Sequence, residues 1–129
     1  MVLGRPHYLP LFLQRLELGS SDLWTSDELT GQNKPKVVGT SVKVPEHLQV
    51  CKKWFRLIGV IRHHHYGETG SGHYSADFYR PIWEKDGSIG ETWRWFHADD
   101  AIVREISLNR VLESAKQEAC VLLYQMNNE

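Results

Sequence analysis

The chain has 129 residues, of which 41% are hydrophobic and 24% are charged, and its formal net charge is −1 at pH 7. A single domain of this size can bury roughly two-thirds of its unfolded surface, so a hydrophobic core is feasible. The near-zero net charge provides no field that would attract nucleic acid or a membrane surface, and no apolar run reaches the roughly 18 residues of a membrane-spanning helix.

The N-terminal segment lacks the pattern of a signal peptide, and the chain carries two cysteines, Cys51 and Cys120. We therefore expect reduced thiols and a cytoplasmic or nuclear location. Residues 19–35 are rich in Ser, Thr, Asp, Asn and Gly, which predicts an exposed loop between the first two strands. The next strand, from Phe55 to Ile61, has apolar residues on both faces and is expected to be covered on both sides.

Three consecutive histidines, His63, His64 and His65, follow that strand. A histidine cluster can bind zinc, but consecutive strand residues point to opposite faces of a sheet. The run therefore predicts no metal site.

A β-hairpin is predicted in the middle of the chain. The segments from Tyr74 to about Pro81 and from Thr92 to Ala98 have the composition of strands, and residues 84–88 form a polar, glycine-containing loop between them. The hairpin is the element that would bring distant polar side chains together.

Pairing symmetric about Asp86 places His73 directly opposite Asp99. Directly opposed residues have Cβ atoms roughly 4.5–5.5 Å apart, so we expect an imidazole–carboxylate hydrogen bond. Such a bond fixes the imidazole tautomer and leaves the other ring nitrogen free to act on a nucleophile. The alternative is an ordinary polar pair at the surface with no chemistry.

The C-terminal region is expected to hold the one helix. Ser107 would cap a short helix from Leu108 to about Ser114, and residues 116–118 would return the chain to a last, buried strand. The fold class predicted is α+β, with a mainly antiparallel sheet and little helix.

Six motifs, in order along the chain, resemble those of the ubiquitin-specific proteases, the papain-like cysteine deubiquitinases. The clearest are Gly72–Ala76, which matches the histidine box "G-H-Y-x-A", and Trp95–Val103, which resembles "W-x-x-F-D-D-x-x-V". The others are Leu9–Leu16, Val42–Leu48, Phe55–Ile61 with His64 or His65 and Gly67, and Ala119–Tyr124. The resemblance implies that residues 1–129 are the C-terminal half of a papain-like catalytic domain, its palm and sheet part.

The resemblance also implies roles for individual residues. His73 corresponds to the general base, Asp99 to the acid that orients it, and Asp100 to a supporting acid. Three further residues would line the slot for the ubiquitin tail: Gly72, Tyr74 and His65. The implied reaction is thiol-dependent hydrolysis after the C-terminal glycine of ubiquitin, with ubiquitin or a ubiquitinated protein as partner and with neither a metal nor an organic cofactor.

The nucleophile of the family is missing, because no segment resembles its "G-N-T-C-Y-x-N" box. Cys51 adjoins two lysines that would favour the thiolate, but it is expected far from His73. Cys120 is expected in a buried strand, as a small hydrophobe. The chain alone is therefore predicted to be inactive, as a fragment that needs an N-terminal cysteine-box half. The alternative is a ubiquitin-binding module, or pseudo-deubiquitinase, that has lost catalysis.

Overall fold

The computed structural model describes residues 7–14, 16–17, 24–26, 33–37, 41–65 and 72–127. The elements are β1 (Tyr8–Phe12), β2 (Leu16–Glu17), β3 (Trp24–Ser26), β4 (Asn33–Val37), β5 (His47–Val50), β6 (Lys53–His65), β7 (Gly72–Trp83), β8 (Ile89–Asp99), β9 (Ile102–Glu105), α1 (Leu108–Glu118) and β10 (Ala119–Met126). None of the described helical segments is both long and apolar enough to cross a membrane.

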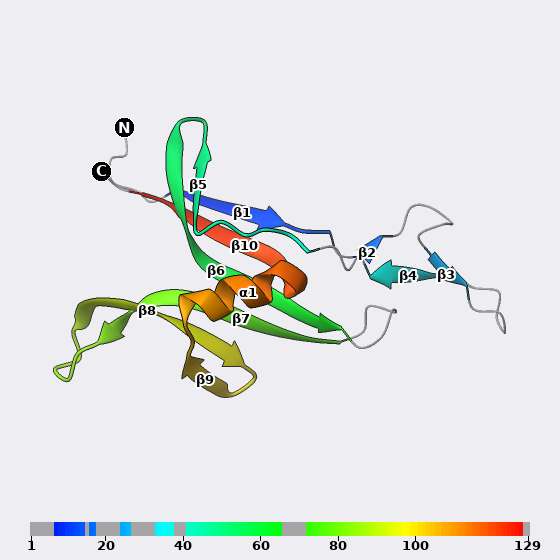
Figure 1. Cartoon of the computed structure of the whole chain (residues 1–129). Coiled ribbons are helices and arrows are strands. Elements are labelled where there is room, and N and C mark those ends of the chain that lie inside the picture. The colour runs from blue at the N-terminus through cyan, green and yellow to red at the C-terminus, as the bar shows by residue number, and fades with distance from the viewer. Residues whose placement is uncertain are drawn as a thin grey trace.

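Seven of the strands form one antiparallel sheet. Its order is β1-β10-β6-β7-β8-β9, and β5 pairs with the first part of β6. Figure 1 shows α1 lying across one face of this sheet, over its middle strands. The predicted α+β class with a mainly antiparallel sheet is confirmed.

The prediction of a single loop over residues 19–35 was wrong in part. It contains β3 and most of β4, which pair with each other, and β2 pairs with β4 to complete a three-stranded sheet. Trp24 and Thr25 are aromatic and β-branched residues that favour strands, although the sequence on either side of them is mostly polar. The rest of the predicted loop lies outside the described residues.

The core lies between α1 and the sheet. Val111 and Ala115 of α1 are fully buried, and the sheet contributes Leu57, Val60 and Tyr124. The hydroxyl of Tyr124 donates a hydrogen bond to the carbonyl oxygen of Pro45 at 2.7 Å, and burial raises the pKa of Tyr124 to about 12. This bond fastens the segment before β5 to the core.

Helix α1 begins where the sequence predicts and ends later. The Ser107 side chain accepts a hydrogen bond from the backbone N–H of Arg110, which confirms the predicted cap. The helix continues past Ser114 to Glu118, and β10 follows at once. The prediction that residues 116–118 form a connection between the helix and the last strand was therefore wrong. Burial of Ala115 and the contact of Glu118 with Arg62 of β6 hold this last turn in helical form.

The register of the β7–β8 hairpin differs from the predicted one. Trp83 pairs with Ile89, as symmetry about Asp86 requires, but a bulge after Pro81 shifts the remaining pairs by two residues. Proline has no N–H to donate and within sheets is found at edges and bulges. Because a two-residue shift preserves the face of every side chain, His73 and Asp99 stay on one face as diagonal neighbours instead of directly opposed ones.

The sheet face opposite α1 carries an apolar row, with the guanidinium of Arg80 lying over the rings of Phe78 and Phe96 beside it. One row of directly paired residues crosses six strands: Phe12, Val121, Ile61, Ala76, Ala98 and Val103. Phe12 is 77% exposed, Ile61 42% and Val103 53%. We call this row and its surroundings the reverse face. Strand β6 is thus covered on one side only within the described part of the chain.

Candidate active site

The predicted site residues lie at one end of the β7–β8 pair. His73 is the second residue of β7 and Asp99 is the last residue of β8. Asp100 follows in a two-residue turn that leads to β9, since Asp99 pairs with Ile102. The backbone of Asp100 has a φ of 52°, a left-handed conformation that Asp tolerates better than most residues because its short polar side chain can bond locally.

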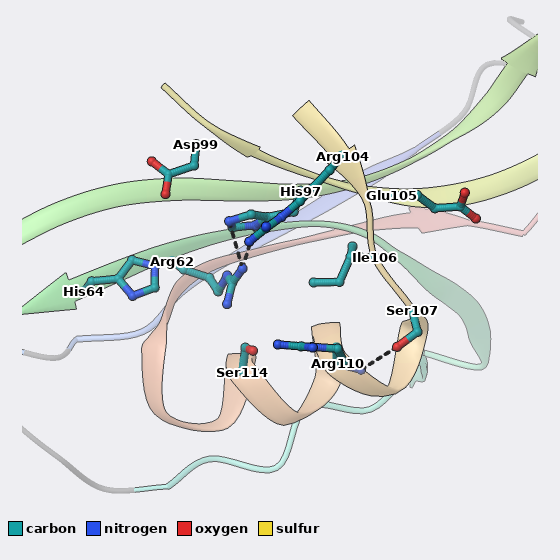
Figure 2. Close-up of a pocket in the computed structure, with 10 residues that line it drawn as sticks. All are labelled: Arg62, His64, His97, Asp99, Arg104, Glu105, Ile106, Ser107, Arg110 and Ser114. Atoms are coloured by element: carbon teal, nitrogen blue, oxygen red, sulfur yellow. Dashed lines mark hydrogen bonds between the residues drawn. The ribbon is translucent and has the colours of Figure 1, made fainter. Parts of the chain in front are cut away.

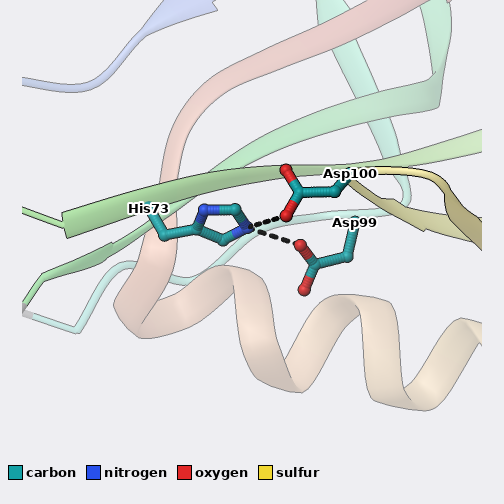
Figure 3. Close-up of side chains that lie close together, drawn as sticks. All are labelled: His73, Asp99 and Asp100. Atoms are coloured by element: carbon teal, nitrogen blue, oxygen red, sulfur yellow. Dashed lines mark hydrogen bonds and ion pairs between the residues drawn. The ribbon is translucent and has the colours of Figure 1, made fainter.

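The imidazole of His73 contacts the carboxylate of Asp99 and leaves one nitrogen unused. Its Nε2 forms a hydrogen bond with Oδ1 of Asp99, and Oδ2 of Asp100 lies 3.9 Å from the same nitrogen. Figure 3 shows both acids on the Nε2 side of the ring, with Nδ1 turned away. The predicted contact between His73 and Asp99 is confirmed, and Asp99 makes it in preference to Asp100.

The two groups stabilise each other's charged forms. The hydrogen bond to Asp99 and its negative charge raise the pKa of His73 above its usual 6.5, and Asp100 adds to this effect. The bond to His73 lowers the pKa of Asp99 below its usual 3.8. The arrangement therefore favours an imidazolium held by a carboxylate, which is the state that stabilises a thiolate neighbour.

We expect Asp99→Asn to lower the pKa of His73 toward 6.5, because it removes the main cause of the upward shift. NMR titration of the His73 ring protons, in the soluble complex of the chain with a cysteine-bearing half, measures this.

In the unchanged chain, the contribution of the His73–Asp99 pair to folding stability is complete below the unfolded pKa of His73 and is lost as pH rises through the raised folded value. It is also lost as pH falls through the lowered pKa of Asp99. An unchanged His73 titration in the variant would contradict the assignment.

The three residues expected to bind the ubiquitin tail are placed differently from one another. Gly72 is exposed at the start of β7, beside His65 of β6 in the ladder. The Tyr74 ring packs on His63, 4.6 Å between centroids, and lies on the reverse face because side chains alternate along a strand. It is therefore not beside the His73 ring. The side chain of His65 lies outside the described residues, and the role of all three stays a prediction.

A buried polar network beneath the site was not anticipated from the sequence. Arg62 of β6 lies 3.0 Å from Asp77 of β7, and Nδ1 of His97 on β8 lies 2.6 Å from the same carboxylate. These side chains are 7% or less exposed. Glu118 of α1 also contacts Arg62, at 3.2 Å. The signal in the sequence is the presence of Arg62, Asp77 and His97 at positions of these strands that face the core.

Neither cysteine can reach His73. Cys51 lies in the β5–β6 turn, whereas His73 pairs with His64 at the other end of β6, roughly 35 Å away at 3.3 Å per strand residue. Cys120 is half-buried in β10, where its thiol donates to the carbonyl oxygen of Ile61. Strand β6 lies between β10 and β7, so β10 and β7 are roughly 10 Å apart at the usual strand spacing. Neither thiol therefore adjoins the His73 ring.

Two groups of residues contain possible metal ligands. In the three-histidine run, His63 packs on Tyr74 on the reverse face while His64 contacts Ser75 and Glu118 on the other. The side chains of His63 and His64 therefore point to opposite faces of the sheet, as strand alternation predicts. At the site itself, one ligand atom each from His73, Asp99 and Asp100 lie within 4.8 Å of one another, so these three could hold a cation. The sequence predicts none.

Comparison with known proteins identifies similar chains. A family model described as ubiquitin carboxyl-terminal hydrolase matches residues 6–124. The chain is similar to one in the SAGA deubiquitinating module with Ubp8 bound to monoubiquitin, with 25% identity over 94% of this chain and 23% of that one and a TM-score of 0.60. The yeast SAGA module carrying an Sgf73 mutant gives 26% identity, 94% and 25% coverage and a TM-score of 0.60.

A third structure shares the fold at low sequence identity. A crystal structure of an essential yeast splicing factor matches with a TM-score of 0.61 and 16% identity, over 94% of this chain and 25% of that one. At that identity the likeness concerns the fold alone. The chain spans about a quarter of the length of the solved chains that it matches.

Proposed function

Because this chain belongs to the ubiquitin carboxyl-terminal hydrolase family, we propose that it is the histidine- and aspartate-bearing part of a cysteine deubiquitinase. The observation that carries the proposal is the His73 ring, whose Nε2 is bonded to Asp99 while Nδ1 makes no hydrogen bond to a described residue. A ring held in this way has one nitrogen for orientation and one for proton transfer.

The reaction follows from that arrangement. Nδ1 of His73 takes the proton of a cysteine thiol supplied by the rest of the catalytic domain, and the thiolate attacks the carbonyl carbon of the last glycine of ubiquitin. The imidazolium then gives its proton to the departing amine, leaving ubiquitin as a thioester. Water then loses a proton to the same nitrogen and its oxygen bonds to the thioester carbon. The carbon–sulfur bond breaks, the imidazolium returns the proton to the sulfur, and ubiquitin leaves with a free carboxylate. Asp99 stabilises the imidazolium at each stage, and Asp100 adds negative charge 3.9 Å away.

The remainder of the domain is also what we propose covers the reverse face. Contiguous exposed apolar residues mark interaction sites, and about three-quarters of each matched chain has no counterpart here. An N-terminal half that carries the cysteine would supply both the nucleophile and the cover. The chain without it should aggregate.

A ubiquitin-binding module without catalysis is the second candidate. The absence of a thiol near His73 among the described residues favours it for the chain in isolation. Retention of His73, Asp99 and Asp100 in bonded geometry favours the enzyme, because binding alone has no need for a base with an orienting acid.

Hydrolysis of a fluorogenic ubiquitin C-terminal amide tests the proposal. We expect the chain alone to give no turnover, since neither cysteine reaches His73, and co-expression with the cysteine-box half of a related enzyme to raise solubility and produce turnover. A soluble monomer that unfolds cooperatively and gains nothing from that partner would favour the binding module. Turnover by the chain alone that Cys51→Ala abolishes would overturn the site assignment.

A further inference from the structure

A cavity of about 540 Å³ lies beside the candidate active site, between the first turns of α1 and the ends of β8 and β9. Its walls come from β6, β8, β9 and α1, with Asp99 at one rim. The lining includes three arginines from three elements, Arg62, Arg104 and Arg110, and the hydroxyls of Ser107 and Ser114. Figure 2 shows these side chains arranged around the same space.

The positive charge in this cavity is only partly neutralised. Arg62 is matched by Asp77 and Glu118, at 3.0 and 3.2 Å. Of the two acids in the lining, Asp99 is bonded to His73 and Glu105 to Arg94 at 3.3 Å. Arg104 and Arg110 form no ion pair with any residue in the described ranges, so two guanidinium groups face the cavity with unmatched charge.

The position of Arg110 adds to this excess. It lies in the first turn of α1, which contains no acidic residue, and the start of a helix carries a partial positive charge from its free N–H groups. A cation there is unfavourable unless an anion offsets it. The Ser107 hydroxyl caps the helix and lines the same cavity as Arg104 and Arg110.

We propose that this cavity binds the phosphate group of a small phosphorylated molecule, held by Arg104, Arg110 and the start of α1. Guanidinium groups present planar paired donors that suit phosphate oxygens, and helix N-termini bind phosphates in the same way. The volume falls in the range of roughly 300–1,000 Å³ for small-molecule pockets. It therefore has room for more than an inorganic ion, and the space toward His64 and Ser114 would take the rest of the ligand.

Titration of the ¹⁵N-labelled full chain with AMP, in soluble complex with an unlabelled cysteine-bearing half and followed by NMR, tests this site, with adenosine as the phosphate-free comparison. We expect AMP at millimolar concentration to shift the amide signals of residues 104–111, and adenosine to leave them unchanged. Arg104→Gln and Arg110→Gln should each weaken AMP binding about tenfold or more, because each removes a charge-assisted hydrogen bond. Both side chains are exposed and without an ion pair among the described residues, so both variants should fold.

Two matched variants separate a site from diffuse surface charge. Lys85→Gln removes one positive charge from the exposed β7–β8 turn, away from the cavity, and should leave affinity unchanged. Glu105→Gln removes a negative charge from the wall and should leave binding intact or tighter. The proposal is overturned if AMP and adenosine give the same shifts, if neither binds, or if Lys85→Gln weakens binding as much as Arg104→Gln. These readouts do not depend on hydrolysis, so they stand apart from the proposed enzyme.

Discussion

In an enzyme assembled from this chain and a cysteine-bearing half, His73→Gln lowers kcat for ubiquitin amide hydrolysis by about a thousandfold, with little change in KM. A positioned general base contributes typically 10²–10⁴-fold, and glutamine has no basic nitrogen to take the thiol proton. Its amide can still donate a hydrogen bond to Asp99, which limits the structural disturbance. Steady-state kinetics on the fluorogenic substrate measure the effect.

The two neighbouring acids supply the control for this prediction. Asp99→Asn should also lower kcat strongly, because the amide cannot stabilise the imidazolium as a carboxylate does. Asp100→Asn should lower kcat by less than about tenfold, since its carboxylate is 82% exposed and 3.9 Å from Nε2. If Asp100→Asn proved as damaging as Asp99→Asn, then Asp100 would be the orienting acid. A His73→Gln enzyme with full activity would remove His73 from the mechanism.

The contact between His73 and Asp99 could be predicted because it depends on strand alternation more than on register. Symmetry about Asp86 gave pairs that a bulge after Pro81 displaces by two residues. A displacement by two leaves both side chains on the face of α1, and long polar side chains bridge diagonal neighbours. A displacement by one would have separated them. Pro81 itself was the available warning that the ladder is interrupted there.

The cap of α1 was predictable for a similar reason, since a Ser before a helical pattern acts locally. The end of α1 was not, because it depends on Glu118 reaching Arg62, 56 residues earlier in the chain. The network of Arg62, Asp77 and His97 was missed for the same reason. It exists only after three strands have been placed side by side, and local patterns do not fix which strands are neighbours.

That network is expected to contribute more to stability than any exposed ion pair in the described part of the chain. The Asp77 side chain is fully buried and contacts both Arg62 and His97. Removing one partner of a buried pair leaves an uncompensated charge in a medium of low polarity, which costs about 3–5 kcal/mol. Glu118 remains as a second partner of Arg62, which places the expected cost for Asp77→Ala near the lower value.

We therefore expect Asp77→Ala to lower the free energy of unfolding by about 3 kcal/mol, measured by urea titration of the soluble complex with a cysteine-bearing half. The matched control is Glu105→Ala, which removes the exposed partner of Arg94 and should change stability by less than about 1 kcal/mol. A loss for Asp77→Ala no larger than that of the control would show that water or Glu118 compensates Arg62 fully. In that case the strands beneath the active site would be held in place by the apolar core of β6, β10 and α1 alone.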